Sequence, residues 1–377
     1  MELNPFVFNR PLDPDQLIDR EEEAERLLAL AEGGHASRLS APRRYGKTSL
    51  LRRVGRDAER VGLNYVEVDF YGALSLTDLV GRMEEGYDRL RSPLRRAAMG
   101  VIQTLRPKLS LGAGPLRIEA QAIPREQANQ VLAALLDLPL TLFERDGTRT
   151  LVAFDEFQEL LAVGGGVDGL FRSHIQRHGD AASYIFAGSN PRLMHQLFDL
   201  RERPFFGQAR VFKLGPLSHA DLIEYVGDRF EETGRDATPA LPALLGLADG
   251  HPQRAMLLAH HLWERTPSGE IATLEIWQET LEAVFLEHGE ALEATWDSLA
   301  SNEQAVLAAL SFGAESLFNQ RTLNRFELSK GAAQHARDRL AQMGHLHQVE
   351  GRWRLVDPLL EEWIVRLEAR GTAGQAR

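Results

Sequence analysis

The chain has 377 residues, of which 44% are hydrophobic and 26% are charged. This length exceeds one ordinary hydrophobic core and predicts two or three domains, while the composition excludes a largely disordered protein. The sequence has no cysteine, which excludes disulfides, thiol nucleophiles and thiolate metal sites, and its net charge of −11 excludes a molecule that binds nucleic acid over its whole surface.

No segment of the sequence is suited to a membrane. The longest apolar stretch, residues 131–143, contains Asp137 and is shorter than the roughly 18 apolar residues of a membrane span. Residues 1–10 carry an acid and a proline rather than a basic patch followed by an apolar block, so we expect no signal peptide. These features predict a cytoplasmic protein with no membrane partner.

The first half of the chain alternates helices and strands. Amphipathic periodicity predicts a helix from Asp15 to Ala31, followed by a short strand over 36–40 and a second helix over 49–61. Apolar and β-branched runs predict four more strands, at 64–70, 151–154, 184–187 and 211–214. This order predicts an α/β domain, built on a doubly wound parallel sheet, over residues 1–216. An inserted β-hairpin is expected over 105–121, around a Gly/Pro turn.

The second half of the chain is predicted to be mainly helical. Helical periodicity separated by Gly and Pro predicts a small helical domain over residues 217–286. Three further helices and two short strands around Glu350 and Gly351 predict a winged helix-turn-helix over 287–377, with the last seven residues disordered.

The strongest chemical signal lies between the short strand and the helix over 49–61. Backbone N–H groups of a strand-to-helix turn can wrap phosphates, a lysine can meet the β- and γ-phosphates, and an adjacent hydroxyl can hold Mg²⁺. Gly46, Lys47 and Thr48 fill these roles. The candidate phosphate-binding residues are Ala41, Pro42, Arg43, Arg44, Tyr45, Gly46, Lys47, Thr48 and Ser49. The competing interpretation is a turn that contains a lysine by chance.

Ala41 departs from the phosphate-loop pattern, which has Gly at that position. If the backbone there needs a positive φ, Ala is strained by about 1 kcal/mol.

An apolar strand ending in acids supplies the second half of such a site. Residues 151–154 are followed by Asp155, expected to hold Mg²⁺ through water, and Glu156, expected to polarise the attacking water. Alone, this pattern fits a strand end with solvated acids equally well. The phosphate loop and the acidic strand end are stronger evidence together, because a nucleotide site needs both.

Polar residues also follow the strand over 184–187. Because ligands of open α/β sheets bind at the carboxyl ends of the strands, Ser189 or Asn190 is expected to orient the γ-phosphate or the water. The alternative for either residue is a cap on the following turn.

These motifs, in this order, resemble the AAA+ ATPases, and specifically the archaeal-type group related to origin initiators and signalling ATPases. The resemblance extends over nearly the whole chain, and its motifs are Asn4-Pro5-Phe6, residues 18–23, RRYGKTSLL at 43–51, DEFQEL at 155–160, AGSN at 187–190, GPLS at 215–218, GHPQR at 250–254 and VDPLLEEW at 356–363. It implies a P-loop domain with a helical lid and a winged helix, and it implies ATP with Mg²⁺.

The resemblance also implies roles for individual residues. Adenine is expected near Ile18 and Arg20, the first sensor at Ser189 or Asn190, and the second sensor at Arg254 in the lid. The implied catalytic group is therefore Lys47, Glu156, Ser189, Asn190 and Arg254, with Thr48 and Asp155 at the metal.

Two positions depart from the family pattern. Asp19 stands where relatives usually have Gly, and Gln208 stands where relatives often have an arginine that completes a neighbour's site. Loss of such an arginine puts fast hydrolysis in doubt, with Arg203 or Arg210 as substitutes.

The segment 321–354 is basic within an acidic chain. It has seven Lys and Arg residues against three acidic ones, and a helix over 329–343 followed by a wing suits double-stranded DNA. A protein-contact module is the alternative. The basic residues concerned are Arg321, Arg325, Lys330, Arg337, Arg339, Arg352 and Arg354.

The histidines show no metal-ligand spacing joined to carboxylates, so we expect surface or satisfied core positions for them. They include His35, His174, His178, His251, His260, His261, His345 and His347.

The sequence as a whole predicts an ATPase that switches conformation and acts on DNA or on a protein partner, with a homo-oligomer as a further candidate assembly. The alternative is a nucleotide-gated regulator or scaffold with low turnover.

Overall fold

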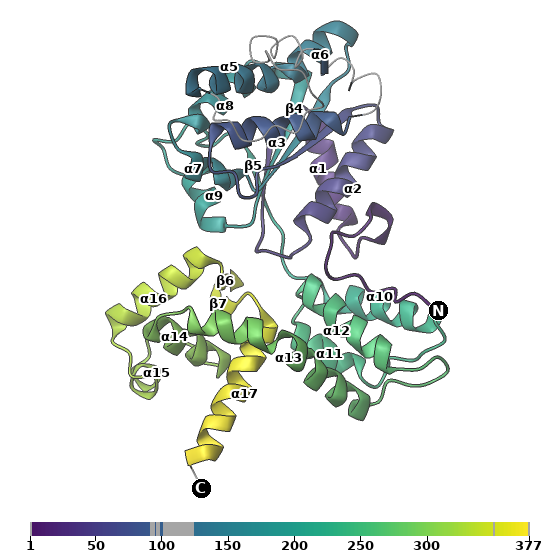
Figure 1. Cartoon of the computed structure of the whole chain (residues 1–377), viewed down its shortest axis with the longest axis vertical. Helices are drawn as coiled ribbons and strands as arrows, with labels where there is room; N and C mark the ends of the chain where they lie inside the picture. The colour runs from purple at the N-terminus through teal and green to yellow at the C-terminus, as the bar shows by residue number, and fades with distance from the viewer. Residues whose placement is uncertain (1, 91–94, 96–98, 101–123, 350, 376–377) are drawn as a thin grey trace. The chain divides into compact units, whose positions relative to one another are not determined.

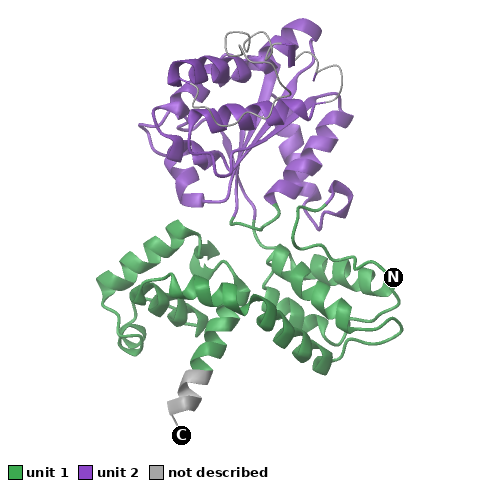
Figure 2. Cartoon of the chain, in the orientation of Figure 1, with its two compact units in different colours: residues 1–12, 42–46, 215–377 green, residues 13–41, 47–214 purple. Residues whose placement is uncertain are grey.

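The computed structural model describes residues 2–90, 95, 99–100, 124–349 and 351–375 (Figure 1). The β-hairpin expected over 105–121 lies outside the described residues. The chain divides into two compact units (Figure 2). Unit 1 comprises residues 1–12, 42–46 and 215–377, and unit 2 comprises residues 13–41 and 47–214.

A five-stranded parallel sheet forms the centre of unit 2 (Figure 1). Its order is β2 (Asn64–Asp69), β3 (Thr150–Asp155), β4 (Ala182–Gly188), β1 (Ser37–Ser40) and β5 (Arg210–Lys213). All five strands lie where the sequence predicts them, to within two residues at either end. The central strands β3 and β4 are buried along their whole length, as expected for a parallel sheet covered by helices.

The helices of unit 2 join these strands. They are α1 (Glu21–Glu32), α2 (Lys47–Arg60), α3 (Leu76–Asp88), α5 (Arg125–Leu136), α6 (Leu138–Asp146), α7 (Leu160–Val163), α8 (Val167–Ile175) and α9 (Pro191–Phe198), with 3₁₀ turns at Pro14–Gln16, Phe157–Glu159 and Gly179–Ala181. The strands and crossover helices confirm the predicted α/β class.

The helix predicted from Asp15 to Ala31 is wrong in its first part. Residues Pro14–Gln16 form a 3₁₀ turn, and α1 begins at Glu21 because Asp19 and Arg20 have positive φ values of 42° and 117°. Asp tolerates the left-handed region better than most residues, since its short side chain can hydrogen-bond locally. Here the Asp19 carboxylate accepts a hydrogen bond from the Arg20 N–H at 2.9 Å. Asp19 is therefore suited to this left-handed position.

Aromatic side chains fill the core that fixes the ends of β3 and β4. The Phe157 ring lies 4.7 Å from that of Phe186, and Phe154 stacks on Phe70 at 5.4 Å. Phe171 packs edge-on against Phe154 at 5.6 Å. All five rings are at most 1% exposed. Because each ring contributes a large buried apolar area, this core holds the residues that follow the two strands in fixed positions.

Unit 1 contains two helical groups. The first has α10 (His219–Glu232), α11 (Leu241–Ala248), α12 (Pro252–Arg265) and α13 (Leu274–Asp297). The second has α14 (Ser301–Ser311), α15 (Gln320–Arg325), α16 (Lys330–Met343), the antiparallel pair β6 (Leu346–Val349) and β7 (Arg352–Leu355), and α17 (Pro358–Gln375). Three helices followed by a β-hairpin is the element order of a winged helix.

Two boundaries in unit 1 differ from simple sequence expectations. Helix α13 runs without a break through residue 286, and α17 continues into the seven final residues for which the sequence predicts disorder.

The first residues of the chain also belong to this unit. The Phe6 ring lies 5.4 Å from that of Phe230, and the Asn4 side chain donates to the His260 carbonyl at 3.0 Å. Among the described residues, no helix has the length and apolar character needed to cross a membrane.

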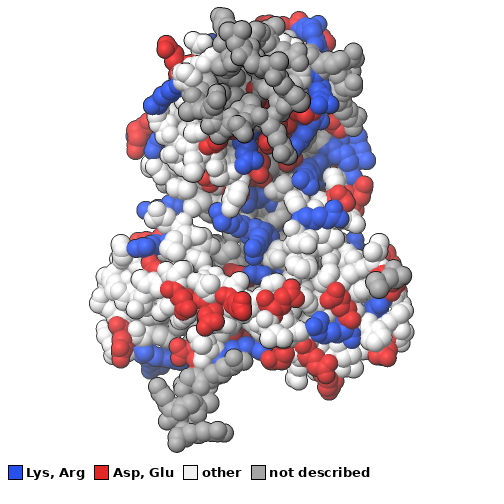
Figure 3. All heavy atoms as spheres, in the orientation of Figure 1, with Lys and Arg blue, Asp and Glu red and all other residues white. Residues whose placement is uncertain are grey.

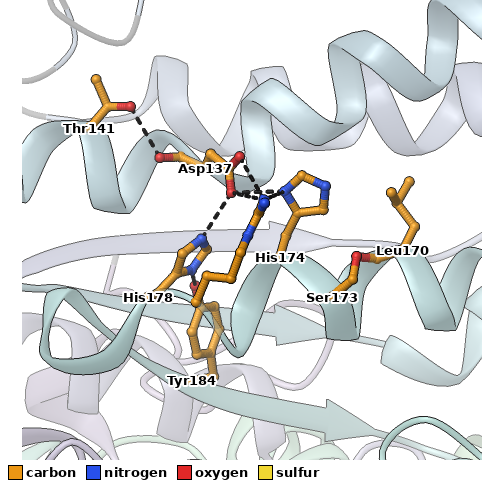
Figure 4. Close-up of polar contacts among 8 residues, drawn as sticks. Asp137, Thr141, Leu170, Ser173, His174, His178 and Tyr184 are labelled. Carbon is orange, nitrogen blue, oxygen red and sulfur yellow. Dashed lines mark hydrogen bonds and ion pairs between the residues drawn. The ribbon is translucent and has the colours of Figure 1, made fainter.

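A partly buried polar network joins the α5–α6 junction and the end of α8 to β4 (Figure 4). The Asp137 carboxylate lies 2.8 Å from His174 Nδ1, 3.1 Å from His178 Nε2 and 3.1 Å from the Arg177 guanidinium. The other ring nitrogen of His178 is bonded to the Tyr184 hydroxyl. Both nitrogens of the buried His178 ring are therefore satisfied, which confirms the core position expected for this histidine.

This network makes the stability of unit 2 depend on pH. Burial lowers the pKa of His178, and hydrogen bonds from His174 and His178 outweigh burial to lower the pKa of Asp137. Between the unfolded pKa of His178, about 6.5, and its lower folded value, the unfolded chain binds more protons, so stability falls with decreasing pH. The Asp137 contribution is lost at lower pH, below about 4.

Replacing His178 should therefore change both the stability and its pH dependence. We expect His178→Asn to reduce the free energy of unfolding by about 1–3 kcal/mol and to flatten its dependence on pH below about pH 6.5. The measurement is urea denaturation followed by circular dichroism, because all five tryptophans lie in unit 1. The exposed His219 provides the control variant His219→Asn. An unchanged slope in His178→Asn would contradict the assignment.

Candidate functional site

The loop after β1 has the backbone shape that its sequence requires. Arg44 and Gly46 have positive φ values of 66° and 84°, and α2 begins at Lys47. Ala41 is buried and outside the left-handed region, so the strain considered for it does not arise. The Ala41 N–H donates to the Gly188 carbonyl at 3.3 Å, which joins the start of the loop to the end of β4.

Lys47, Thr48 and Asp155 lie together in unit 2. The Thr48 hydroxyl donates to Asp155 Oδ2 at 2.7 Å, and Lys47 Nζ lies 3.4 Å from the Ala41 carbonyl. Lys47 and Asp155 are 5% and 4% exposed. Burial raises the pKa of Asp155, although the Lys47 charge opposes this. A hydroxyl and a carboxylate side by side are oxygen donors of the kind that Mg²⁺ prefers.

Glu156 is held in one orientation by three donors. Its Oε2 accepts hydrogen bonds from the Ser189 N–H at 3.2 Å, from the Ser189 hydroxyl at 2.6 Å and from the Gln158 amide. Its Oε1 lies 4.0 Å from Lys47 Nζ. Glu156 itself has a φ of 51°, a conformation that a non-glycine residue adopts at a cost and that is common at functional sites. The carboxylate thus has one fixed oxygen and one oxygen facing the lysine.

The two polar residues after β4 have different positions. Ser189 bonds to Glu156, whereas the Asn190 side chain accepts from the N–H groups of Arg192 and Leu193, both at 3.1 Å, and caps α9. From the sequence, each of the two residues could act as a sensor or cap the following turn. In the structure, Ser189 bonds to Glu156, whereas Asn190 caps α9.

Gln158 is a site residue that sequence reasoning missed. Its position in DEFQEL, two residues after the acid, was visible, but nothing in the sequence indicates that the 3₁₀ turn over Phe157–Glu159 brings its amide back to Glu156. Gly188 makes room for it, since a Cβ atom there would lie 2.4 Å from Gln158 Oε1 and 2.5 Å from Met194 Sδ.

The residues expected near adenine are both buried. Ile18 is 5% exposed and Arg20 is 6% exposed, and the Arg20 guanidinium donates to Glu23 at 2.9 Å. Their assignment to adenine stays a prediction.

Arg254 is paired within unit 1. It opens α12, and its guanidinium binds the Asp357 carboxylate through two hydrogen bonds, one of them 2.8 Å long. The Arg44 side chain lies close enough that the Arg254 charge, after burial, lowers the pKa of Arg44. The Tyr45 ring packs edge-on against His251 at 5.0 Å. GHPQR, VDPLLEEW and the middle of the loop after β1 therefore lie near one another, with the Arg254–Asp357 pair close enough to Arg44 to influence its charge.

Two of the three positions considered for a neighbour-completing arginine make side-chain contacts within unit 2. Gln208 accepts a hydrogen bond from Arg172 at 2.8 Å, and Arg203 pairs with Asp168 at 3.3 Å, whereas Arg210 is an exposed residue of β5. Arg172, on α8, was not singled out from the sequence, although it brings a guanidinium to the side chain of Gln208.

Three of the seven basic residues of segment 321–354 are paired with acids. Arg337 binds Asp338 and stacks over Phe318 and Trp353, and Arg339 binds Glu303 at 3.0 Å. On the wing, Arg354 binds Asp249 at 2.9 Å. On the face drawn in Figure 3, acidic and basic side chains are interspersed over the described residues of unit 1. Lys330 and Arg352 are exposed.

Comparisons with known proteins identify the fold. No protein-family model matches the sequence, and no curated protein is similar to it. The structure is similar to the Walker-type ATPase of Pyrococcus abyssi, with a TM-score of 0.67 and 20% identity over 95% of this chain and 99% of that one. It is also similar to the ORC2 protein of Aeropyrum pernix. For the ADPNP–ADP complexes the TM-score is 0.59, with 17% identity over 97% of this chain and 98% of that one. For the ADP form it is 0.53, with 17% identity over 98% of both chains.

The chain therefore has the fold of the archaeal-type AAA+ ATPases. The likeness extends over both units and agrees with the family that the sequence motifs resemble.

Proposed function

We propose that this protein binds ATP with Mg²⁺ and hydrolyses it. The observation that carries the proposal is the hydrogen-bonded group Thr48–Asp155 and Ser189–Glu156, with Lys47 beside it, at the carboxyl ends of parallel strands. The ORC2 protein, whose fold is similar, has structures with ADPNP and ADP, which supports an adenine nucleotide as the ligand here.

The residues present fit a magnesium nucleotide. Thr48 and Asp155 would hold Mg²⁺, which supplies charge neutralisation at the β- and γ-phosphates. Lys47 is nearly fully buried, so its ammonium group gains most from an anion that replaces the weak 3.4 Å contact to the Ala41 carbonyl. The backbone N–H groups around Gly46 open a helix, where phosphates bind favourably.

Glu156 is suited to act as the base. Because Ser189 and Gln158 occupy Oε2, the remaining oxygen, Oε1, is the one that can take a proton from an attacking water. The donors on Oε2 keep the carboxylate from turning away, so Ser189 and Gln158 act as positioning residues for Glu156.

The assignment of Lys47 can be tested by binding. Lys47→Ala should lose measurable affinity for Mg·ATP, because the loop loses its cation at the β/γ-phosphates. Isothermal titration with Mg·ATP measures this, with the exposed Lys213 as the control variant Lys213→Ala. Retained affinity in Lys47→Ala would show that the loop is not a phosphate site.

If Glu156 is the base, replacing it should affect ATP hydrolysis and leave ATP binding unchanged. Glu156→Gln should bind ATP as the native protein does and hydrolyse it about 10²–10⁴-fold more slowly, which is the usual effect of losing a positioned base. Steady-state phosphate release measures the rate, with Glu159→Gln as the control on the same turn. An unchanged rate would make Glu156 structural.

The Arg254–Asp357 pair is proposed to couple the nucleotide to the C-terminal part of unit 1. In the proposed role, Arg254 is a second sensor that gives up Asp357 in favour of a phosphate. Asp357 lies immediately before α17, and the pairing with Arg254 outweighs burial to lower the pKa of its carboxyl. Exchange of a carboxylate for a phosphate is chemically reasonable, since guanidinium groups bind both through paired hydrogen bonds.

Variants of Arg254 and Asp357 distinguish a sensor role for Arg254 from a purely structural one. Arg254→Ala alone should destabilise unit 1 by about 3–5 kcal/mol, because it leaves Asp357 without its partner. The double variant Arg254→Ala/Asp357→Asn should recover much of the stability and still bind ATP about tenfold more weakly. Asp357→Asn, which keeps Arg254, should bind ATP at least as well as the native protein. Native affinity in the double variant would contradict a sensor role.

DNA is the proposed target of the winged helix. The net charge of segment 321–354 supports weak binding to duplex DNA, with Lys330 and Arg352 as the main exposed contacts. Arg337, Arg339 and Arg354 contribute less, because each is neutralised by an acid in the same unit.

A binding assay on the full chain tests this proposal. We expect association with duplex DNA at low salt, a steep loss as salt rises, and a salt slope reduced by about 1 for each of Lys330→Ala and Arg352→Ala. Lys213→Ala/Arg60→Ala, in unit 2, is the control. If low-salt binding is absent, the winged helix is a protein-contact module.

The alternative function is a nucleotide-gated regulator with low turnover. The observation that favours it is Gln208 at the position where relatives often have arginine, since an arginine finger is worth several orders of magnitude in rate. Stimulation of turnover by DNA would separate the ATPase from this regulator.

The domain boundaries at 216 and 286, the cytoplasmic location and a homo-oligomeric assembly are proposed on the sequence arguments alone.

A further inference from the structure

Helices α12 and α13 of unit 1 bring two histidines and a glutamate together. His261 lies on α12, and Glu287 and His288 lie on α13. His261 Nε2 is 3.6 Å from one oxygen of Glu287, and His288 Nε2 is 3.7 Å from the other. One ligand atom from each residue lies within 4.8 Å of the other two. The sequence did not reveal this group, because 26 residues separate the two helices' contributions and only packing joins them.

The histidine nitrogens of this group are buried and unsatisfied. Neither nitrogen of His261, a residue only 6% exposed, has a hydrogen-bond partner in the part of the chain that the structure describes, and the same holds for His288 Nε2. Buried polar atoms are almost always bonded, since leaving them unpaired costs about 1–3 kcal/mol each. The neighbouring His260 follows that rule, as its Nδ1 bonds to the Phe6 carbonyl at 2.8 Å.

We propose that His261, Glu287 and His288 form a Zn²⁺ site that joins α12 to α13. Zinc bonds of about 2.0–2.2 Å in a tetrahedral arrangement place ligand atoms roughly 3.4 Å apart. The observed separations of 3.6 and 3.7 Å run to the two different oxygens of Glu287. One ligand atom of each residue lies within 4.8 Å of the others, so side-chain rotations that shorten these distances toward roughly 3.4 Å would let one ion bind all three residues.

The kinds of ligand atom in this group favour one metal ion over others. Two imidazoles with one carboxylate suit Zn²⁺, whereas Mg²⁺ and Ca²⁺ prefer oxygen ligands alone. Three protein ligands leave the fourth tetrahedral position for water. The Glu287 side chain is 57% exposed, which gives the ion a route from solvent.

The charges around the group are mixed. Beside His261, the carboxylates of Glu287 and Glu264 favour a cation, whereas Arg265 opposes one. The Glu264 carboxylate lies 3.9 Å from His261 Nδ1, where a small rotation would let that N–H donate to it and orient the ring. At His288, the carboxylates of Glu287 and Asp357 favour a cation, and the charges of Arg254 and Arg44 oppose one.

The site would stabilise the lid independently of the nucleotide. Helix α12 carries Arg254 in its first turn and His261 two turns later, so an ion between α12 and α13 would fasten the helix that holds the proposed sensor. This inference does not depend on the proposed ATPase activity, because its ligands are distinct from Lys47, Thr48, Asp155 and Glu156.

Titration of the full-length, untagged protein with ZnSO₄ tests the proposal. The buffer contains excess Mg²⁺ and no nucleotide, so that Zn²⁺ does not report on Asp155. We expect one Zn²⁺ per chain, a rise in Tm of about 5 °C at saturation, and, with Co²⁺ in place of Zn²⁺, the visible absorption of a tetrahedral nitrogen and oxygen site.

Single variants identify the ligands. His261→Asn, His288→Asn and Glu287→Gln should each weaken Zn²⁺ binding by at least about tenfold and remove the Tm rise, whereas His219→Asn should leave both unchanged. Because Glu287 is exposed, Glu287→Gln keeps the test valid even if His261→Asn fails to fold. Absence of one-to-one binding, or native affinity in Glu287→Gln or His288→Asn, would overturn the proposal.

Discussion

The hydrogen bond between Thr48 and Asp155 joins parts of the chain that are 107 residues apart, and the candidate site depends on it. It forms because β1 and β3 are parallel strands of one sheet, so the residues that follow them emerge at the same edge. The phenylalanine core beneath β3 and β4 then fixes the strand ends. Glu156, one residue after Asp155, can therefore be held by Ser189 from the neighbouring strand.

The buried charged side chains have different kinds of partner in the two units. In unit 2, the buried side chains of Lys47 and Asp155 interact with each other, and the Thr48 hydroxyl donates a hydrogen bond to the Asp155 carboxylate. In unit 1, Arg254 is satisfied by Asp357, and Arg44 is close to both. A buried carboxylate can be exchanged for another anion only if the alternative offers similar paired hydrogen bonds, which restricts the partners that could compete with Asp357.

The histidines illustrate why residue type alone does not determine a role. His178 and His261 are both buried, and sequence reasoning assigned both to surface or satisfied core positions. For His178 this is confirmed, because Asp137 and Tyr184 take its two nitrogens. For His261 the expected burial is correct, but the expected hydrogen bonds are not present. Its ring nitrogens have no hydrogen-bond partner among the described residues, and Nε2 lies near a carboxylate from another helix. The difference lies in which side chains the helix packing brings to each ring.

The sequence by itself determined the class of the fold and the five strands of the sheet, and it predicted a phosphate loop after the first of them. These follow from local patterns: apolar runs of strand length, strand-to-helix alternation, and Gly46-Lys47-Thr48 at a turn. Only the tertiary structure decided that Ser189 rather than Asn190 holds Glu156, that Gln158 joins it, that Asp357 pairs with Arg254, and that α12 and α13 bring His261 to Glu287 and His288. Each of these depends on side chains that meet through packing or through an irregular turn, and hydrophobic periodicity carries no information about such meetings.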